Sequence, residues 1–268
     1  MSKMSEYVIS ADGTRIAFDR QGSGPPVILV DGAFQFRAFD PTTAELQQLL
    51  AERGFAVVRY DRRGRGESPA HAPITLAQTI EDLRAIVDEL TDGADDAVAL
   101  FGNSSGGAIA LAAAAVGLPV SKLVLFEVPL DDELGTDGAE FLDGLRERIA
   151  VGDGSATVEY FMSDFPPEWV EGAKHSDAWA VMTGLAPSLE PDSESLAWTQ
   201  SAARSALWAG IAAPTLVLVG SETLDVMRPA ADSLVANLPH AELREVAASD
   251  HRWEPREMAI TVAEFLVG

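Results

Sequence analysis

Short apolar runs alternate with amphipathic segments along most of this chain. The apolar runs predict eight strands, at residues 7–10, 15–19, 26–30, 55–60, 97–101, 122–126, 214–219 and 242–246. The segments between and after them predict helices at 41–53, 76–90, 105–116, 228–238 and 255–267. Because strands and helices alternate, we expect right-handed βαβ units and a mostly parallel sheet that is flanked by helices.

The regular alternation stops between residues 129 and 208. This stretch contains no clear strand, and four of the five tryptophans of the chain fall in it, at positions 169, 179, 198 and 208. Strand and helix patterns return after it. We therefore predict one scaffold made of residues 1–128 and 209–268, interrupted by a helical insertion of about 80 residues.

Composition narrows the class of protein. The chain has 268 residues, a formal net charge of −23 and no cysteine. The charge argues against binding nucleic acid or an anionic membrane surface, and the lack of cysteine excludes disulfides and thiol catalysis. No apolar run approaches the roughly 18 residues of a membrane span, and the N-terminal Met-Ser-Lys-Met-Ser-Glu has no apolar signal core. We therefore expect a cytoplasmic enzyme.

A serine stands between two glycines at the end of the fifth predicted strand. Gly102 and Gly106 bracket Ser104 in a Gly-x-Ser-x-Gly pattern, with a strand before it and an alanine-rich helix after it. A sharp strand-to-helix turn strains the central residue and exposes its hydroxyl, and the glycines leave room for the turn. Ser104 is therefore the predicted nucleophile, whereas Ser105 lacks this pair of bracketing glycines.

A serine nucleophile needs a base, and the chain has four histidines. His251 lies between the last predicted strand and the last helix, where a doubly wound sheet gathers residues at the carboxyl ends of its strands. We predict it as the general base. His71 and His175 could lie near the mouth of the site or touch substrate, and His240 is expected on the surface.

Three carboxylates compete for the role of orienting this histidine. Glu127 directly follows the sixth predicted strand and would emerge at the same sheet edge as Ser104. The loop after the seventh predicted strand holds Glu222 and Asp225, but Thr223 occupies the position where the common Gly-x-x-Asp spacing would place the acid. We favour Glu127 over Asp225, and Asp225 over Glu222.

An oxyanion needs preorganised backbone N–H donors. One is expected from Ser105, immediately after the nucleophile. The other is expected from Ala33 or Gly32, in the loop after the third predicted strand. We expect the neighbouring Asp31 to anchor this loop by hydrogen bonds and to take no part in catalysis.

With the serine turn, the Gly32 loop and the late histidine in place, the chain resembles the α/β-hydrolase superfamily over nearly its whole length. Residues 60–68, Tyr-Asp-Arg-Arg-Gly-Arg-Gly-Glu-Ser, are similar to the Asp-x-x-Gly-x-Gly-x-Ser loop of that superfamily. That loop is usually structural, and phosphate binding by its arginines is the alternative. The resemblance implies an α/β-hydrolase fold, with residues 129–208 as a helical cap after the sixth strand.

Three details are similar to the zearalenone lactonases in particular. They are the Asp-Gly pair at 31–32, the Ser-Ser-Gly run at 104–106, and a glutamate that ends the sixth strand. In that family the triad acid is a glutamate at the position that matches Glu127. The resemblance implies a lactone substrate, with zearalenone as one candidate, and further favours Glu127 over Asp225.

These residues predict a serine hydrolase that cleaves a carboxylic ester or lactone through an acyl-enzyme on Ser104. The aromatic insertion implies an apolar small-molecule substrate, with an aromatic one as an option, for which Trp179, Met182 and Phe34 are candidate contacts. No metal or organic cofactor is expected, and a homodimer is one option for the assembly. The alternatives are carbon–carbon bond hydrolysis, cofactor-free haloperoxidase or hydroxynitrile lyase chemistry, or a ligand-binding protein without turnover.

Overall fold

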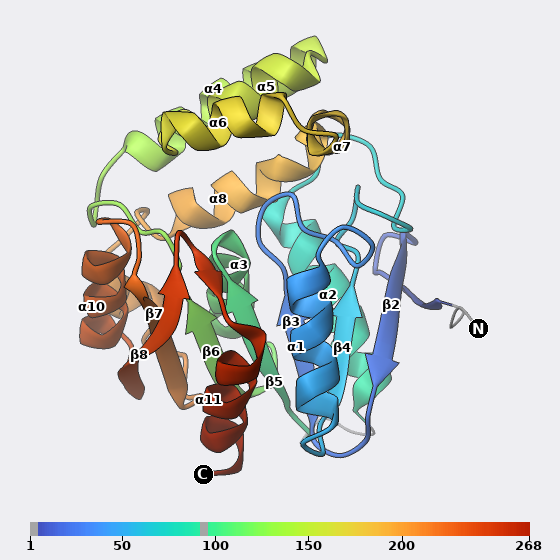
Figure 1. The fold of residues 1–268 in the computed structure, drawn as a ribbon, viewed down its shortest axis with the longest axis vertical. Coiled ribbons are helices and arrows are strands. Elements are labelled where there is room, and N and C mark those ends of the chain that lie inside the picture. The colour runs from blue at the N-terminus through green and yellow to red at the C-terminus, as the bar shows by residue number, and fades with distance from the viewer. Residues whose placement is uncertain (1–4, 92–95) are drawn as a thin grey trace.

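The computed structural model describes residues 5–91 and 96–268, which form a nine-stranded sheet with helices on both faces (Figure 1). The strands are β1 (Glu6–Ile9), β2 (Arg15–Gln21), β3 (Pro26–Val30), β4 (Ala56–Tyr60), β5 (Val98–Asn103), β6 (Val120–Phe126), β7 (Thr215–Glu222), β8 (Ala241–Ser249) and β9 (Arg252–Trp253). The eight predicted strands correspond to β1–β8. The two-residue β9 is an addition that the apolar pattern did not indicate.

The sheet is parallel at its centre and antiparallel at both ends. Its strand order is β1-β2-β4-β3-β5-β6-β7-β8-β9. All pairs from β4–β3 to β7–β8 are parallel. The pairs β1–β2, β2–β4 and β8–β9 are antiparallel. The predicted mostly parallel sheet is confirmed, and β1 and β2 form an antiparallel hairpin at one end of it.

Five helices cover the two faces of the sheet. They are α1 (Pro41–Ala51), α2 (Leu76–Leu90), α3 (Ser105–Ala115), α10 (Met227–Asn237) and α11 (Pro255–Val267). The apolar faces of α1 and α11 share one buried cluster, which includes Leu46 and Val262. The apolar faces of α2, α3 and α10 share the other, which includes Leu83, Leu111 and Leu234. Burial of these two clusters holds the sheet rigidly between its helices.

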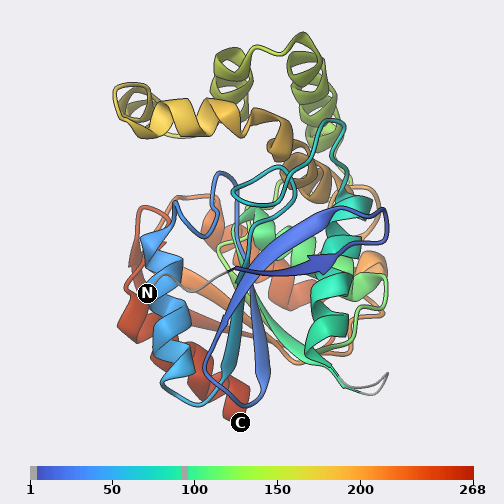
Figure 2. The same ribbon diagram turned by 90° about the vertical axis from the view of Figure 1, so that its right-hand side faces the viewer.

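The insertion after β6 is helical, as predicted. It contains α4 (Asp137–Val151), α5 (Gly154–Phe161), α6 (Pro167–Lys174), α7 (Ala178–Gly184), the 3₁₀ helix η1 (Ala186–Leu189), α8 (Glu190–Trp198) and α9 (Arg204–Leu207). Helices α4 to α7 lie beyond the carboxyl ends of the central strands, and α8 lies between them and the sheet (Figures 1 and 2). The insertion has its own apolar cluster, built around Leu145, Val158 and Leu189.

A buried ion network joins the insertion to the scaffold. Asp192 of α8 is fully buried, and its carboxylate accepts hydrogen bonds at 2.6 Å from Arg62, Arg65 and the hydroxyl of Ser105. A carboxylate shared by two guanidinium groups satisfies charges that burial alone would make costly. The arginines of the 60–68 loop therefore hold the fold together, which supports the structural interpretation of that loop.

No helix in the described ranges is long and apolar enough to cross a membrane. We expected no apolar signal core at the N-terminus. Residues 1–4 of that segment lie outside the described residues.

Candidate active site

Ser104 occupies a strained turn between β5 and α3. Its backbone has φ 54° and ψ −131°, a region that residues with a side chain rarely adopt. Steric contacts require glycine at both flanking positions. A Cβ on Gly106 would collide with the carbonyl oxygen of Val30, and a Cβ on Gly102 would collide with Gly107. The strand therefore turns into the helix within a space that admits no side chain two residues before or two residues after the serine.

Glu127 and His251 form a close pair at the carboxyl edge of the sheet. Glu127 directly follows β6 and is almost completely buried, with 2% of its surface exposed. Its Oε2 lies 2.5 Å from Nδ1 of His251, and its Oε1 accepts a 2.9 Å hydrogen bond from the backbone N–H of Gly220. The ring of Phe126 packs against the imidazole, with centroids 6.0 Å apart. The histidine is thus held by a carboxylate and by an aromatic face.

The surroundings of Glu127 keep its carboxyl group ionised. Burial by itself raises the pKa, but the interactions with His251, the Thr223 hydroxyl and the Gly220 amide outweigh it and leave the pKa below its ordinary value. An ionised carboxylate at Nδ1 favours the tautomer that carries its proton there, so that Nε2 is left to act as a base.

Neither of the two competing acids is paired with the histidine. Glu222 and Asp225 are both exposed, and within the described residues neither makes a hydrogen bond or ion pair with His251. The loop that carries them contributes Thr223 instead, whose hydroxyl lies close to Glu127. The geometry therefore favours Glu127 as the partner of the histidine.

Gly32 approaches the serine closely, but its amide has another partner. The Gly32 N–H donates to Oε1 of Gln35 at 2.8 Å, so it is not available to an oxyanion. A Cβ on Gly32 would lie 2.9 Å from the carbonyl oxygen of Asn103 and 3.1 Å from the Cβ of Ser104, which explains the need for glycine. Of the three predicted donors, the amides of Ala33 and Ser105 remain candidates.

The prediction that the Asp31 carboxylate anchors its loop by hydrogen bonds was wrong. Within the described residues, its side chain makes no hydrogen bond, and its Oδ2 lies 3.9 Å from the guanidinium of Arg59. Burial raises the pKa of this carboxyl to about 7, although Arg59 acts in the opposite direction. Asp31 therefore does not anchor the loop by side-chain hydrogen bonds.

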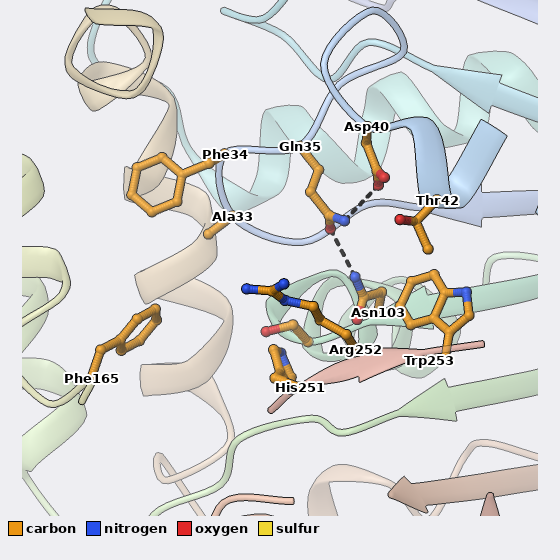
Figure 3. Close-up of a pocket in the computed structure, with 11 residues that line it drawn as sticks. Ala33, Phe34, Gln35, Asp40, Thr42, Asn103, Phe165, His251, Arg252 and Trp253 are labelled. Atoms are coloured by element: carbon orange, nitrogen blue, oxygen red, sulfur yellow. Dashed lines mark hydrogen bonds between the residues drawn. The ribbon is translucent and has the colours of Figure 1, made fainter. Parts of the chain in front are cut away.

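Ser104 and His251 line the same cavity, whose volume is about 180 Å³. Figure 3 shows Ala33, Phe34 and Phe165 along one side of it, and Gln35, Asp40 and Asn103 along the other. The full lining comprises Ala33, Phe34, Gln35, Asp40, Thr42, Asn103, Ser104, Phe165, His251, Arg252 and Trp253. The cavity thus has an apolar side and a polar side, with the serine and the histidine facing it.

Only one of the three predicted substrate contacts lines this cavity. Phe34 does so, with its ring edge-on to Phe161 at 5.4 Å. Trp179 and Met182 are not among its lining residues: Met182 is buried in the apolar cluster of the insertion, and Trp179 packs against that cluster. Phe165 is the insertion's contribution to the cavity, and sequence periodicity gave no signal that could distinguish it from its aromatic neighbours.

The remaining histidines lie away from the cavity. His71, His175 and His240 are exposed, and none of them is among its lining residues. Among residues 5–91 and 96–268, no group of three or more histidine or carboxylate side chains is arranged to hold a metal ion.

A strained serine after β5, a histidine held by a buried glutamate and a mostly parallel sheet define an α/β-hydrolase type of scaffold and site. The chain belongs to the alpha/beta hydrolase family, whose model matches residues 12–264. An α/β hydrolase of known structure from Sphaerobacter thermophilus DSM 20745 is 36% identical, with a TM-score of 0.81, over 97% of this chain and 100% of that chain. The predicted fold is thereby confirmed.

Two further proteins are similar to this chain, one in structure and one in part of its sequence. The enol-lactonase from Burkholderia xenovorans LB400 has a TM-score of 0.69 at 21% identity, over 98% of this chain and 100% of that chain. The probable oxidoreductase EphD of Mycobacterium bovis is 42% identical over 96 residues, which are 34% of this chain. The match spans only 16% of the length of that curated relative, so the likeness is local.

Proposed function

We propose that this protein is a serine hydrolase that cleaves a carboxylic ester or lactone through an acyl-enzyme on Ser104. One observation carries the proposal: the strained serine shares a cavity with a histidine whose Nδ1 lies 2.5 Å from a buried carboxylate. A serine hydroxyl is a weak nucleophile until a positioned base takes its proton, and this arrangement supplies such a base.

In the proposed reaction, His251 removes the proton from Ser104 as its Oγ attacks the substrate carbonyl. The amides of Ala33 and Ser105 stabilise the oxyanion, and Glu127 stabilises the imidazolium that forms. His251 then gives its proton to the leaving alkoxide. A water molecule, deprotonated by the same histidine, hydrolyses the acyl-enzyme and releases the acid.

The size and lining of the cavity support a small substrate with an apolar part. A volume of about 180 Å³ lies below the roughly 300–1,000 Å³ of most ligand pockets. Phe34 and Phe165 supply the apolar side. The resemblance to zearalenone lactonases stays a prediction, and the cavity volume favours an ester or lactone smaller than that macrolactone.

A fluorophosphonate probe tests the nucleophile directly. We expect it to label the native chain and not Ser104→Ala, with Ser201→Ala, an exposed serine away from the cavity, as the matched control. A panel of aryl esters, alkyl esters and lactones, read by mass spectrometry, then identifies the bond. Labelling without turnover of any ester or lactone would favour non-ester chemistry, and no labelling would favour a ligand-binding protein.

A further inference from the structure

An arginine without a partner stands at the mouth of the candidate active site. Arg252 follows His251 directly and begins β9, and its side chain lines the same cavity as Ser104. Figure 3 shows its guanidinium group turned into the space between His251 and Gln35. Within the described residues, this group makes no hydrogen bond and no ion pair.

Most arginines of this chain are used differently. Arg62, Arg63 and Arg65 are buried in ion pairs with carboxylates, and exposed arginines such as Arg228 and Arg244 also lie beside acidic groups. The chain has 42 acidic residues against 19 basic ones, so partners are abundant. Within the described residues, Arg256 likewise makes no ion pair, so what distinguishes Arg252 is that its unpaired guanidinium lines the cavity that also holds Ser104.

The charged neighbours of Arg252 leave its positive charge available. The other ionisable groups that line the cavity are His251 and Asp40. Asp40 caps α1, and its oxygens accept hydrogen bonds from the Thr43 amide, the Thr43 hydroxyl and Gln35. His251 is engaged by Glu127. No cavity-lining carboxylate is thus paired with the guanidinium.

We propose that Arg252 binds a carboxylate of the substrate, so that the preferred substrate is a small ester or lactone that also carries a free carboxylate near the scissile carbonyl. This inference rests on the proposed hydrolase function. The planar guanidinium fork matches the two oxygens of a carboxylate. Within the described residues, no second arginine or lysine lines the cavity, so one guanidinium meets the single negative charge of a carboxylate, and the apolar side of the cavity holds the connecting carbons.

Two methyl esters of the same shape test the proposal. Monomethyl succinate carries a carboxylate where methyl 4-oxopentanoate carries a neutral acetyl group. We expect the wild-type protein to favour the anionic ester in kcat/KM by about 10-fold, a modest value because Arg252 is exposed and its field is screened. The preference should decline as salt is added.

Variants of Arg252 then assign the preference to this side chain. In Arg252→Gln, the ratio of kcat/KM between the two esters should fall about 10-fold, mainly through KM for the anionic ester. Arg252→Lys keeps the charge but loses the fork and should recover part of the ratio. Arg256→Gln, an exposed arginine of α11 that does not line the cavity, should leave both values unchanged.

The outcomes separate this inference from the proposed function. Hydrolysis of both esters by the wild type, with a ratio that Arg252→Gln does not alter, overturns the role of Arg252 and leaves the hydrolase intact. If neither ester is hydrolysed and Ser104 is not labelled, the hydrolase proposal fails. Calorimetric titration with succinate still decides the arginine's role in that case: weaker binding to Arg252→Gln supports it, and equal binding or none overturns it.

Discussion

Three residues of the candidate site are held in a backbone conformation that side chains disfavour. Ser104, Glu127 and His251 have φ values of 54°, 45° and 62°. Such conformations cost about 1–3 kcal/mol each and persist only where the surrounding structure enforces them. The strain lies at the nucleophile, the base and the acid of the proposed reaction. These strained conformations lower the stability of the folded state at the positions where geometry matters most for the proposed catalysis.

Replacement of Glu127 tests its role at the residue scale. We expect Glu127→Ala to lower kcat by at least about 100-fold, because His251 loses the carboxylate that orients it and stabilises its charged form. Asp225→Ala, which removes an exposed carboxylate from the alternative loop, should change kcat little. Circular dichroism of both variants controls for folding. A larger loss in Asp225→Ala than in Glu127→Ala would reverse the assignment.

Asp31 gives a pH dependence with a definite sign. Its pKa is raised to about 7 in the folded chain, above the ordinary value of 3.8. The folded protein therefore keeps a proton that the unfolded chain has released, and stability falls as pH rises from about 4 to about 7. The Asn side chain of Asp31→Asn cannot ionise. When the pH rises from about 5.5 to about 8, the free energy of unfolding of this variant should therefore increase by on the order of 2 kcal/mol relative to that of the wild type.

Urea unfolding at the two pH values measures this difference, with Asp88→Asn as an exposed control on α2 that should show none. An equal effect of Asp31→Asn at both pH values would contradict the raised pKa.

At the scale of secondary-structure elements, the contact between α8 and α3 ties the insertion to the nucleophile turn. Asp192 on α8 accepts a hydrogen bond from Ser105, the first residue of α3, at 2.6 Å. Ser105 also directly follows Ser104, and in the proposed reaction its amide stabilises the oxyanion. A shift of α8 would therefore displace a residue in direct contact with the reaction centre.

Loss of the Asp192 carboxylate should be strongly destabilising. Asp192→Ala leaves the guanidinium groups of Arg62 and Arg65 buried without it, which costs about 3–5 kcal/mol. Urea unfolding measures the effect. Asp232→Asn removes an exposed carboxylate 3.4 Å from Arg228 and should cost less than about 1 kcal/mol.

If Asp192→Ala does not fold, Ser105→Ala tests the same contact with a smaller perturbation. It keeps the amide, removes one hydrogen bond to the carboxylate and should cost about 1–3 kcal/mol. If both variants had the stability of the wild type, the network would contribute nothing to the free energy of unfolding.

Local sequence signals predicted most of these elements, and long-range contacts explain what they missed. The apolar runs located β1–β8, and the amphipathic segments located α1, α2, α3, α10 and α11. Strand β9 was missed because it has two residues and exists only through its pairing with β8. The contact of Asp192 with Arg62 spans 130 positions, a separation that no local pattern encodes.

The same limit applies to the cavity. The glycines around Ser104 and the glutamate that holds His251, Glu127, could be predicted because motif spacing and strand ends fix where they lie. The aromatic residues of the insertion could not, because packing decides which of them face the cavity: Phe165 lines it, whereas Trp179 and Met182 pack inside the insertion.

The charge of the whole molecule gives a further prediction. A formal net charge of −23 makes the folded chain repel itself, and added salt screens repulsion between exposed charges. Buried pairs such as Arg65 with Asp192 are screened much less, so they hold the fold together as the salt concentration rises. We therefore expect the melting temperature to rise by a few degrees between about 20 mM and about 300 mM sodium chloride.

A variant with reduced charge provides the matched control. Asp88 and Glu89 are exposed near the end of α2, and replacing both with lysine changes the formal net charge from −23 to −19, since each reversal adds two positive units. If self-repulsion governs the salt response, the rise in melting temperature should be smaller in Asp88→Lys/Glu89→Lys than in the wild type. Lysines near a helix C-terminus can also stabilise it at low salt, so the slope with salt, and not the absolute melting temperature, is the quantity to compare. A wild-type melting temperature that stays level or falls would mean that exposed ion pairs outweigh the net repulsion.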